Sequence, residues 1–171
     1  MKAEFIIPFI EAATAVGEQI MGAHPSRGEL SMHYELVTTE PINILCGVSG
    51  AIEGIALFGL SRETAMKIGE RMLDTKLRVL DQTVSGAILE FGEKLEKAFS
   101  PRLSKLGYAF ELIPVALVRG MYLPVPTLGS PILGVPLHFE GFGAITVHVS
   151  LDIAAEKDTT GDAFLGEQDA A

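Results

Sequence analysis

The chain has 171 residues, 48% of them hydrophobic, and a formal net charge of −9. This size and hydrophobic content are enough to bury the core of one domain. The acidic balance argues against a nucleic-acid partner, which requires a positive patch, and no apolar stretch reaches the roughly 18 residues of a membrane-spanning helix. The first residues lack the charge order of a signal peptide, and the single cysteine, Cys46, excludes an internal disulfide. We therefore expect a soluble, cytoplasmic protein with no membrane insertion.

The first half of the chain predicts a helix followed by three strands. Residues 3–21 repeat apolar side chains at helical spacing, and glycines and Pro25 follow them. Residues 29–37 alternate loosely between apolar and polar side chains, as in a strand. Residues 42–48 and 51–60 predict a hairpin, because Ser49 and Gly50 between them are turn residues.

The second half predicts two helices and three strands. Ser61 is an N-cap for a helix that ends near Leu73. A long helix is predicted over 77–106, with a bend at Pro101 and a left-handed residue at Gly107. A strand over 109–118, an irregular loop over 124–131 and a hairpin formed by 133–139 and 143–151 complete the prediction.

This element order predicts an α+β fold, in which an antiparallel sheet packs against long helices on one face. We expect residues 1–151 to form the domain and residues 152–171, with six acidic residues and one lysine, to form an acidic, disordered tail. The open edges of such a sheet favour pairing with a second copy, so we expect a homodimer.

The long predicted helix has one apolar face and one charged face. Apolar positions from Val84 to Phe99 fall in one sector at 100° per residue. The opposite sector holds an exposed strip that we name the docking strip, formed by Gly86, Glu90, Glu93, Lys94 and Lys97. The alternative interpretation is an ordinary solvent-exposed helix face without a function. Glu90 with Lys94 and Glu93 with Lys97 are i,i+4 pairs, and each such pair stabilises a helix by roughly 0.2–0.5 kcal/mol.

Two other patterns have simple structural explanations. His138 and His148 could face each other across the last hairpin and hold a metal, but strand histidines satisfied by their neighbours are the more common case. Gly47, Gly50 and Gly54 join two strands rather than a strand and a helix, so they predict a turn and not a phosphate-binding loop.

The hairpin GVSGAIEGIALFGLS, the helix ETAMKIGERML and the segment ILEFGEKLEKAFSPRLSKLGYAFELIPVALVRG together resemble the CheX branch of the CheC/CheX/FliY family. The resemblance covers about residues 3–151. In that family a helix carries Ser or Asp, then Glu, then Asn at the spacing of positions 86, 90 and 93, with a Pro further along the chain. Glu90 and Pro114 match this pattern, whereas Gly86 replaces Ser or Asp, beside Ser85, and Glu93 replaces Asn.

The resemblance implies a chemotaxis protein of two-component signalling that acts on phosphorylated CheY-type response regulators. The helix enters the active site of the regulator, the Glu bonds an active-site Lys, and the Asn amide orients water toward the aspartyl phosphate. Mg²⁺ belongs to the regulator, and the chain needs no cofactor of its own. We expect Glu90 and Glu93 to be the catalytic residues and Gly86, Glu90, Lys94 and Lys97 to form the docking face.

Because Glu93 replaces the Asn of the family, more than one function stays open. The chain's single Asn, Asn43, lies in a predicted strand, so no other Asn is near the strip. The chain is then either a phosphatase impaired by Glu93 or a binding module that kept the docking helix without the chemistry. A structural role through the sheet edge is the third alternative. The first helix has Glu11 and Thr14 at the equivalent spacing and therefore offers no second site.

Overall fold

The computed structural model describes residues 2–155. The helices are a 3₁₀ turn η1 (Ala3–Phe5), α1 (Ile7–Met21), α2 (Arg62–Leu73) and α3 (Gln82–Ser104). The strands are β1 (Ser26–Arg27), β2 (Ser31–His33), β3 (Leu36–Val37), β4 (Ile42–Gly50), β5 (Ile52–Leu60), β6 (Phe110–Arg119), β7 (Pro124–Val125), β8 (Ile132–Phe139) and β9 (Gly143–Ile153). Among these residues no helix is both long and apolar enough to cross a bilayer.

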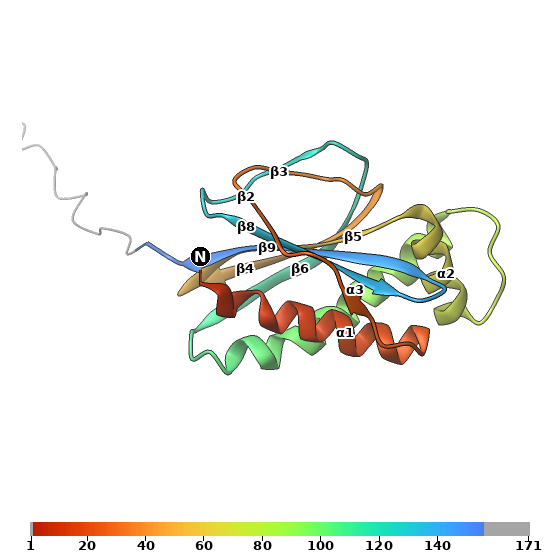
Figure 1. The fold of residues 1–171 in the computed structure, drawn as a ribbon, viewed down its shortest axis with the longest axis horizontal. Helices are drawn as coiled ribbons and strands as arrows, with labels where there is room; N and C mark the ends of the chain where they lie inside the picture. The colour runs from red at the N-terminus through yellow and green to blue at the C-terminus, as the bar shows by residue number, and fades with distance from the viewer. Residues whose placement is uncertain (1, 156–171) are drawn as a thin grey trace, which may run out of the picture.

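One antiparallel sheet organises the molecule. Its strands follow the order β1-β8-β9-β5-β4-β6, and β2 also pairs with β8. The helices α1 and α3 lie together against one face of the sheet (Figure 1). The opposite face carries a small two-stranded ribbon of β3 and β7. The predicted α+β architecture, with long helices against one face of an antiparallel sheet, is therefore confirmed.

The core lies between the helices and the sheet, and α3 contributes its apolar ridge to it. Phe91 and Phe99 are fully buried, and the Phe99 ring lies 4.6 Å from the ring of Phe9 on α1, centroid to centroid. Gly92 brings the helix backbone close to the sheet, because a Cβ atom there would lie 2.7 Å from Ile44 on β4. The ridge fixes which face of α3 points to solvent.

The chain before β4 differs from the single strand predicted over 29–37. It forms three short strands, of which β1 and β2 both pair with β8, while β3 leaves the main sheet to pair with β7. The reason is a set of distant contacts: Leu36 is buried beside Leu57 and Ile132, on the sheet face opposite the helices. The predicted irregular loop over 124–131 accordingly contains β7.

The long helix begins five residues later than predicted. Its N-cap is Asp81, whose carboxylate accepts hydrogen bonds from the backbone N–H groups of Thr83 and Val84. Leu77 instead belongs to the connection, since its N–H donates to the Glu70 carboxylate. At the other end Gly107 has a positive φ of 85°, as predicted, and Pro101 lies inside the last turns of α3.

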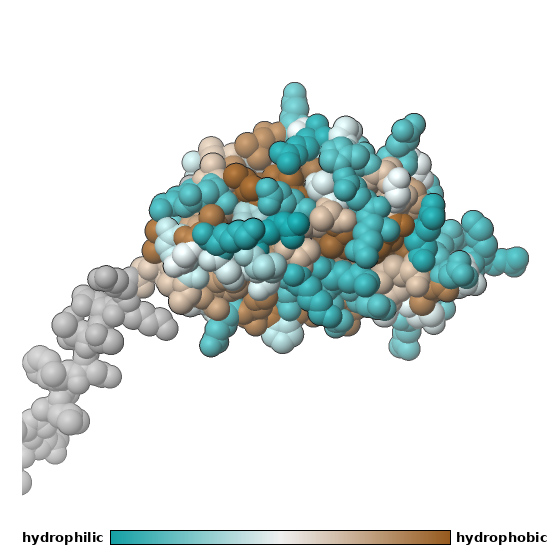
Figure 2. Space-filling model, turned by 90° about the horizontal axis from the view of Figure 1, so that it is seen from below, coloured by the Kyte–Doolittle hydropathy of each residue, from teal (hydrophilic) through white to brown (hydrophobic). Residues whose placement is uncertain are grey.

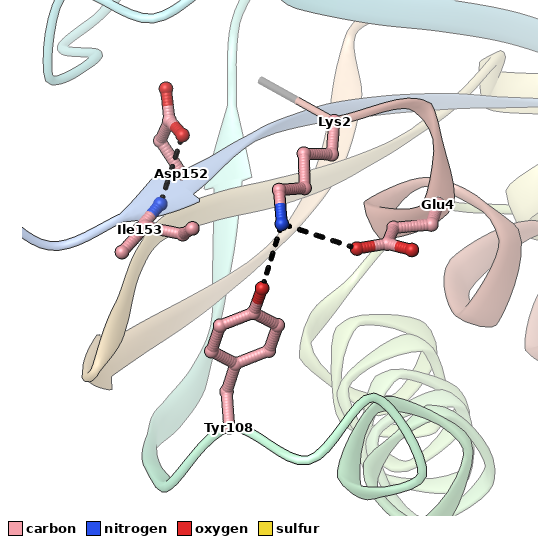
Figure 3. Close-up of polar contacts among 5 residues, drawn as sticks. All are labelled: Lys2, Glu4, Tyr108, Asp152 and Ile153. Atoms are coloured by element: carbon pink, nitrogen blue, oxygen red, sulfur yellow. Dashed lines mark hydrogen bonds and ion pairs between the residues drawn. The ribbon is translucent and has the colours of Figure 1, made fainter.

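The last strand passes the expected domain boundary at residue 151. Asp152 and Ile153 pair with Glu53 and Ile52 and are part of the sheet. Figure 3 places these two residues near the start of the chain, where Lys2 donates a 2.9 Å hydrogen bond to the Tyr108 hydroxyl and lies 3.8 Å from Glu4. The rest of the predicted tail, from residue 156, lies outside the described residues.

Candidate functional site

The docking strip lies on the solvent face of α3. Gly86, Glu90, Glu93 and Lys97 are exposed, and Lys94 is half-buried. Figure 2 views the molecule from the side that carries α1 and α3, and hydrophilic side chains cover most of that face between smaller hydrophobic patches. The structure thus brings all five predicted strip residues together on one accessible helix surface.

The carboxylates of the strip have no charge partner among residues 2–155. The ion pairs within this part of the chain involve other residues, namely Lys2 with Glu4, His24 with Glu18, Lys76 with Glu70, and Arg102 with Glu11. The expected pairs of Glu90 with Lys94 and of Glu93 with Lys97 do not form within 4.0 Å. Both carboxylates are therefore available to an outside partner, which weakens the alternative of a pair-stabilised solvated face.

Neither Gly86, which stands at the Ser/Asp position of the motif, nor its neighbour Ser85 supplies a hydroxyl to the strip. Gly86 faces open space, with no atom within 4 Å of where its Cβ would lie. The Ser85 hydroxyl donates to the backbone oxygen of Asp81 and accepts a 2.7 Å bond from the Arg119 guanidinium. Ser85 thereby joins the start of α3 to the end of β6.

Pro114 lies in an irregularity of β6, the strand that packs against α3. Leu45 pairs with Ala116 and Gly47 pairs with Ile113, so Pro114 and Val115 together lie opposite Cys46. This two-against-one arrangement is a β-bulge. A proline is tolerated there because β6 is an edge strand among the described residues and its missing N–H removes no ladder bond.

Glu96 is a residue of the site region that sequence reasoning missed. It is half-buried, and its Oε2 atom is buried without a hydrogen-bond partner among residues 2–155. Burial raises the pKa of its carboxyl above the ordinary value, the charge of Glu93 raises it further, and Lys97 partly offsets both. The available signal was its spacing of three residues from Glu93, which places the two side chains on neighbouring turns of one helix.

A shallow groove of about 330 Å³ runs between α1 and α3 beside the strip. Its lining combines small apolar side chains with one amide and two lysines: Ala15, Val16, Gln19, Lys94, Lys97 and Ala98. The lysines of the docking strip thus also form one rim of this groove. Glu11, further along α1, lies 3.5 Å from Arg102 and belongs to an ion pair rather than to a second strip.

The remaining sequence candidates do not form a site. His138 pairs with Ala144 and His148 pairs with Gly134, so the two histidines do not face each other across the hairpin. Among residues 2–155 no three His, Cys, Asp or Glu side chains come together as metal ligands.

Burial, with a smaller effect of Glu96, raises the pKa of the Cys46 thiol to about 12 and keeps it protonated. Of the three glycines, Gly47 and Gly54 lie in the paired strands β4 and β5, and Gly50, with a positive φ of 125°, ends β4 at the tight connection to β5.

Comparisons with known proteins relate the sequence and the fold of the chain to chemotaxis proteins. No protein-family model matches the chain. A curated relative, the CheY-P phosphatase CheX of Thermotoga maritima, is 24% identical over 152 residues, which cover 88% of this chain and 97% of that protein. A chemotaxis protein CheX from Desulfovibrio desulfuricans has a similar structure, with a TM-score of 0.75 and 20% identity over 88% of this chain and 99% of that one. A complex of CheX with CheY, BeF3 and Mg²⁺ from Borrelia burgdorferi gives a TM-score of 0.72 and 20% identity over the same shares of the two chains.

The fold is therefore that of the CheC/CheX/FliY proteins, as the sequence resemblance predicted. Within that group the chain is similar to CheX proteins, since the curated relative and two of the similar solved structures are CheX proteins.

Proposed function

We propose that the chain docks onto a phosphorylated CheY-type response regulator through α3 and promotes hydrolysis of its aspartyl phosphate. The observation that carries this proposal is the pair of exposed carboxylates, Glu90 and Glu93, which have no partner within residues 2–155 on the helix of a CheX-like fold. The CheX of Thermotoga maritima is a CheY-P phosphatase, which supports this substrate class. A regulator of this kind works in the cytoplasm, so we place the chain there.

Each strip residue has a role in the docked complex. Glu90 accepts a charge-assisted hydrogen bond from the active-site lysine of the regulator. Glu93 accepts a hydrogen bond from the attacking water and holds it in line with the phosphoryl group, because phosphoryl transfer depends on positioning and charge stabilisation. Lys94 and Lys97 offer cations to the acidic surface around the phosphorylation site. Mg²⁺ is held by the regulator, as the presence of Mg²⁺ in the Borrelia CheX–CheY complex supports.

Glu93 weakens the chemistry relative to an asparagine at the same position. A neutral amide can both donate and accept, whereas an ionised carboxylate only accepts. Two like charges about 4 Å apart in an effective dielectric near 20 repel by about 4 kcal/mol. Uncompensated, that repulsion slows the reaction by a factor on the order of 10³. We therefore propose a slower phosphatase than one with asparagine at this position.

The same substitution favours a second candidate, a non-catalytic receiver-binding module. In that case Glu90 and the two lysines retain the docking function, and Glu93 contributes only repulsion. Replacing Glu93 by alanine would then strengthen binding, whereas in the phosphatase it abolishes turnover.

Binding to an activated regulator tests the docking claim separately from catalysis. The probe is a CheY-type receiver domain loaded with BeF3 and Mg²⁺, titrated by calorimetry with the wild type, Glu90→Ala and the control Glu29→Ala. Glu29 is an exposed carboxylate between β1 and β2, so its removal makes the same charge change away from α3. We expect Glu90→Ala to weaken binding about tenfold or more, since it leaves the regulator's lysine unpaired, and Glu29→Ala to leave it unchanged. Equal affinities for all three proteins would contradict docking through the strip.

We also propose that the chain forms a homodimer. The support is the edge strand β6, which pairs with β4 alone among the described strands, and the large apolar side chains exposed near it, Ile113 and Leu128. A free sheet edge is a template for pairing. Sedimentation equilibrium at micromolar concentration is expected to give twice the mass of one chain, and a single-chain mass over the whole concentration range would contradict the proposal.

A further inference from the structure

Glu96 occupies an unusual place beside the docking strip. It lies one turn beyond Gly92, whose position on α3 contacts Val115 in the β6 bulge. Its charge acts on Cys46, the β4 residue that faces the same bulge. Glu96 therefore lies on the flank of α3 between the docking strip and the face that packs on the sheet, and its Oε2 atom is closed off from solvent without a donor among residues 2–155. A buried carboxylate oxygen left without a hydrogen bond destabilises the charged form of the group.

Few charged groups face this carboxyl. On its own helix Glu93 and Lys97 act on it, with opposite sign. On β4 the Cys46 thiol is influenced by the charge of Glu96 and is itself uncharged at neutral pH. On β6 the segment 112–115, which lies opposite this part of β4, carries no charged side chain. Within the described residues, the group that gains most from a proton on Glu96 is therefore Glu93.

We propose that Glu96 is a positioning residue that takes up one proton when the chain docks and donates it as a hydrogen bond to Glu93. This inference rests on the proposed function and explains how a glutamate works at the asparagine position. The proton comes from water. The carboxylate of Glu96 becomes a carboxylic acid, its O–H donates to one oxygen of Glu93, and the other oxygen of Glu93 accepts from the attacking water. The charge of the pair changes from −2 to −1.

Docking supplies the driving force for this uptake. The phosphoryl group of the regulator adds negative charge beside Glu93, and like charges favour protonation of one member of a coupled pair. Contact with the regulator also removes water from the strip, which strengthens the effect. Glu96 is better placed than Glu93 to hold the proton, because Glu96 is already half-buried and Glu93 is exposed.

The first test follows the pH dependence of binding to the receiver domain loaded with BeF3 and Mg²⁺. Wild type and Glu96→Gln are compared at pH 6, 7 and 8, since glutamine is a permanent donor of nearly the same shape. We expect the wild-type affinity to fall by up to about 100-fold from pH 6 to pH 8 relative to Glu96→Gln, because uptake of one proton on binding changes the affinity by up to about tenfold per pH unit. We expect Glu96→Gln to show only the pH dependence of the receiver itself. The receiver's own pH dependence is common to both proteins and cancels in the comparison. If wild type and Glu96→Gln both bind the receiver and their affinities change with pH in the same way, the inference is overturned and the proposed function stays intact.

The second test needs no regulator. The side-chain carboxyl of Glu96 is titrated by carbon-detected NMR in the wild type and in Glu93→Gln. We expect the midpoint of Glu96 to fall when Glu93 loses its charge, and an unchanged midpoint would overturn the coupling of the two groups. If the coupling is found but neither wild type nor Glu96→Gln binds the receiver at any pH, it is the proposed function that fails, and the docked role of Glu96 fails with it.

Discussion

Gly92 of α3 lies so close to Val115 of β6 that a Cβ atom on the glycine would come within 2.8 Å of the valine Cγ1 methyl group. The same Cβ would meet Ile44 of β4 at 2.7 Å. Both neighbours are β-branched strand residues with stiff side chains. Gly92 therefore sets how near α3 lies to the sheet. Ile88 and Glu96 each lie one helical turn from it along α3.

Substitution of Gly92 by alanine is expected to destabilise the fold despite a gain in helix propensity. Alanine gains about 1 kcal/mol over glycine inside a helix, but overpacking a well-filled core costs about 1–3 kcal/mol. We expect a net loss of about 1 kcal/mol in the free energy of unfolding, measured by urea denaturation.

Gly86→Ala is the matched control on the same helix. Because a Cβ at Gly86 meets nothing within 4 Å, the propensity gain of up to about 1 kcal/mol is unopposed, and this variant is expected to be more stable than the wild type. A stabilising effect of Gly92→Ala of the same size would show that the close approach to Val115 and Ile44 is not a constraint.

The start of α3 at Asp81 can be tested in the same way. Removing a side chain that caps a helix typically costs about 1 kcal/mol, and Asp81 accepts from two backbone N–H groups, those of Thr83 and Val84. We expect Asp81→Ala to lower the free energy of unfolding by about 1 kcal/mol and Asp81→Asn to retain most of it. If both variants were as stable as the wild type, the helix would begin elsewhere.

His148 makes the stability of the fold depend on pH. Burial, with a smaller effect of the charge on His33, lowers the pKa of His148 to about 4, against 6.5 for an ordinary histidine. Its Nδ1 atom is buried without a partner among the described residues. Between these two pKa values the unfolded chain binds more protons than the folded one, so the stability from this group is complete above pH 6.5 and falls as the pH is lowered toward 4. The full loss is on the order of 3 kcal/mol.

Urea unfolding at pH 7.5 and pH 5 measures this effect in the wild type, His148→Gln and His138→Gln. His138 is exposed and provides the control. The wild type and His138→Gln are expected to lose stability at pH 5 and His148→Gln to lose less. A pH dependence that is the same in all three proteins would assign the effect to other groups.

The sequence could predict those parts of the molecule that depend on local periodicity. The apolar ridge of α3 repeats at helical spacing, so it determines the exposed position of Glu90 and Glu93 without knowledge of the rest of the fold. The β4–β5 hairpin follows from its turn residues in the same way. The division of the predicted strand 29–37 into β2 and β3 was not predictable, because β2 pairs with β8 and β3 pairs with β7, both far along the chain.

The helix start and Glu96 were missed for related reasons. Leu77 fits the helical pattern, but its N–H bonds to Glu70 on another helix. Glu96 fits the sequence pattern of a solvated helix position, and spacing alone does not show that its Oε2 atom is buried. That Glu90 and Glu93 form no ion pair within residues 2–155 likewise depends on side-chain conformations that spacing alone does not determine.

The decay of the aspartyl phosphate on a CheY-type regulator with Mg²⁺ measures directly whether docking through α3 promotes hydrolysis. The regulator is followed with no added protein, with the wild type, with Glu93→Asn and with Glu90→Ala. We expect the wild type to speed the decay above the spontaneous rate, Glu93→Asn to speed it further by up to about 10³-fold, and Glu90→Ala to remove the effect. Acceleration by Glu93→Asn alone would assign the natural chain to the binding modules. If neither wild type nor Glu93→Asn accelerates the decay, docking of this helix onto a phosphorylated regulator is contradicted.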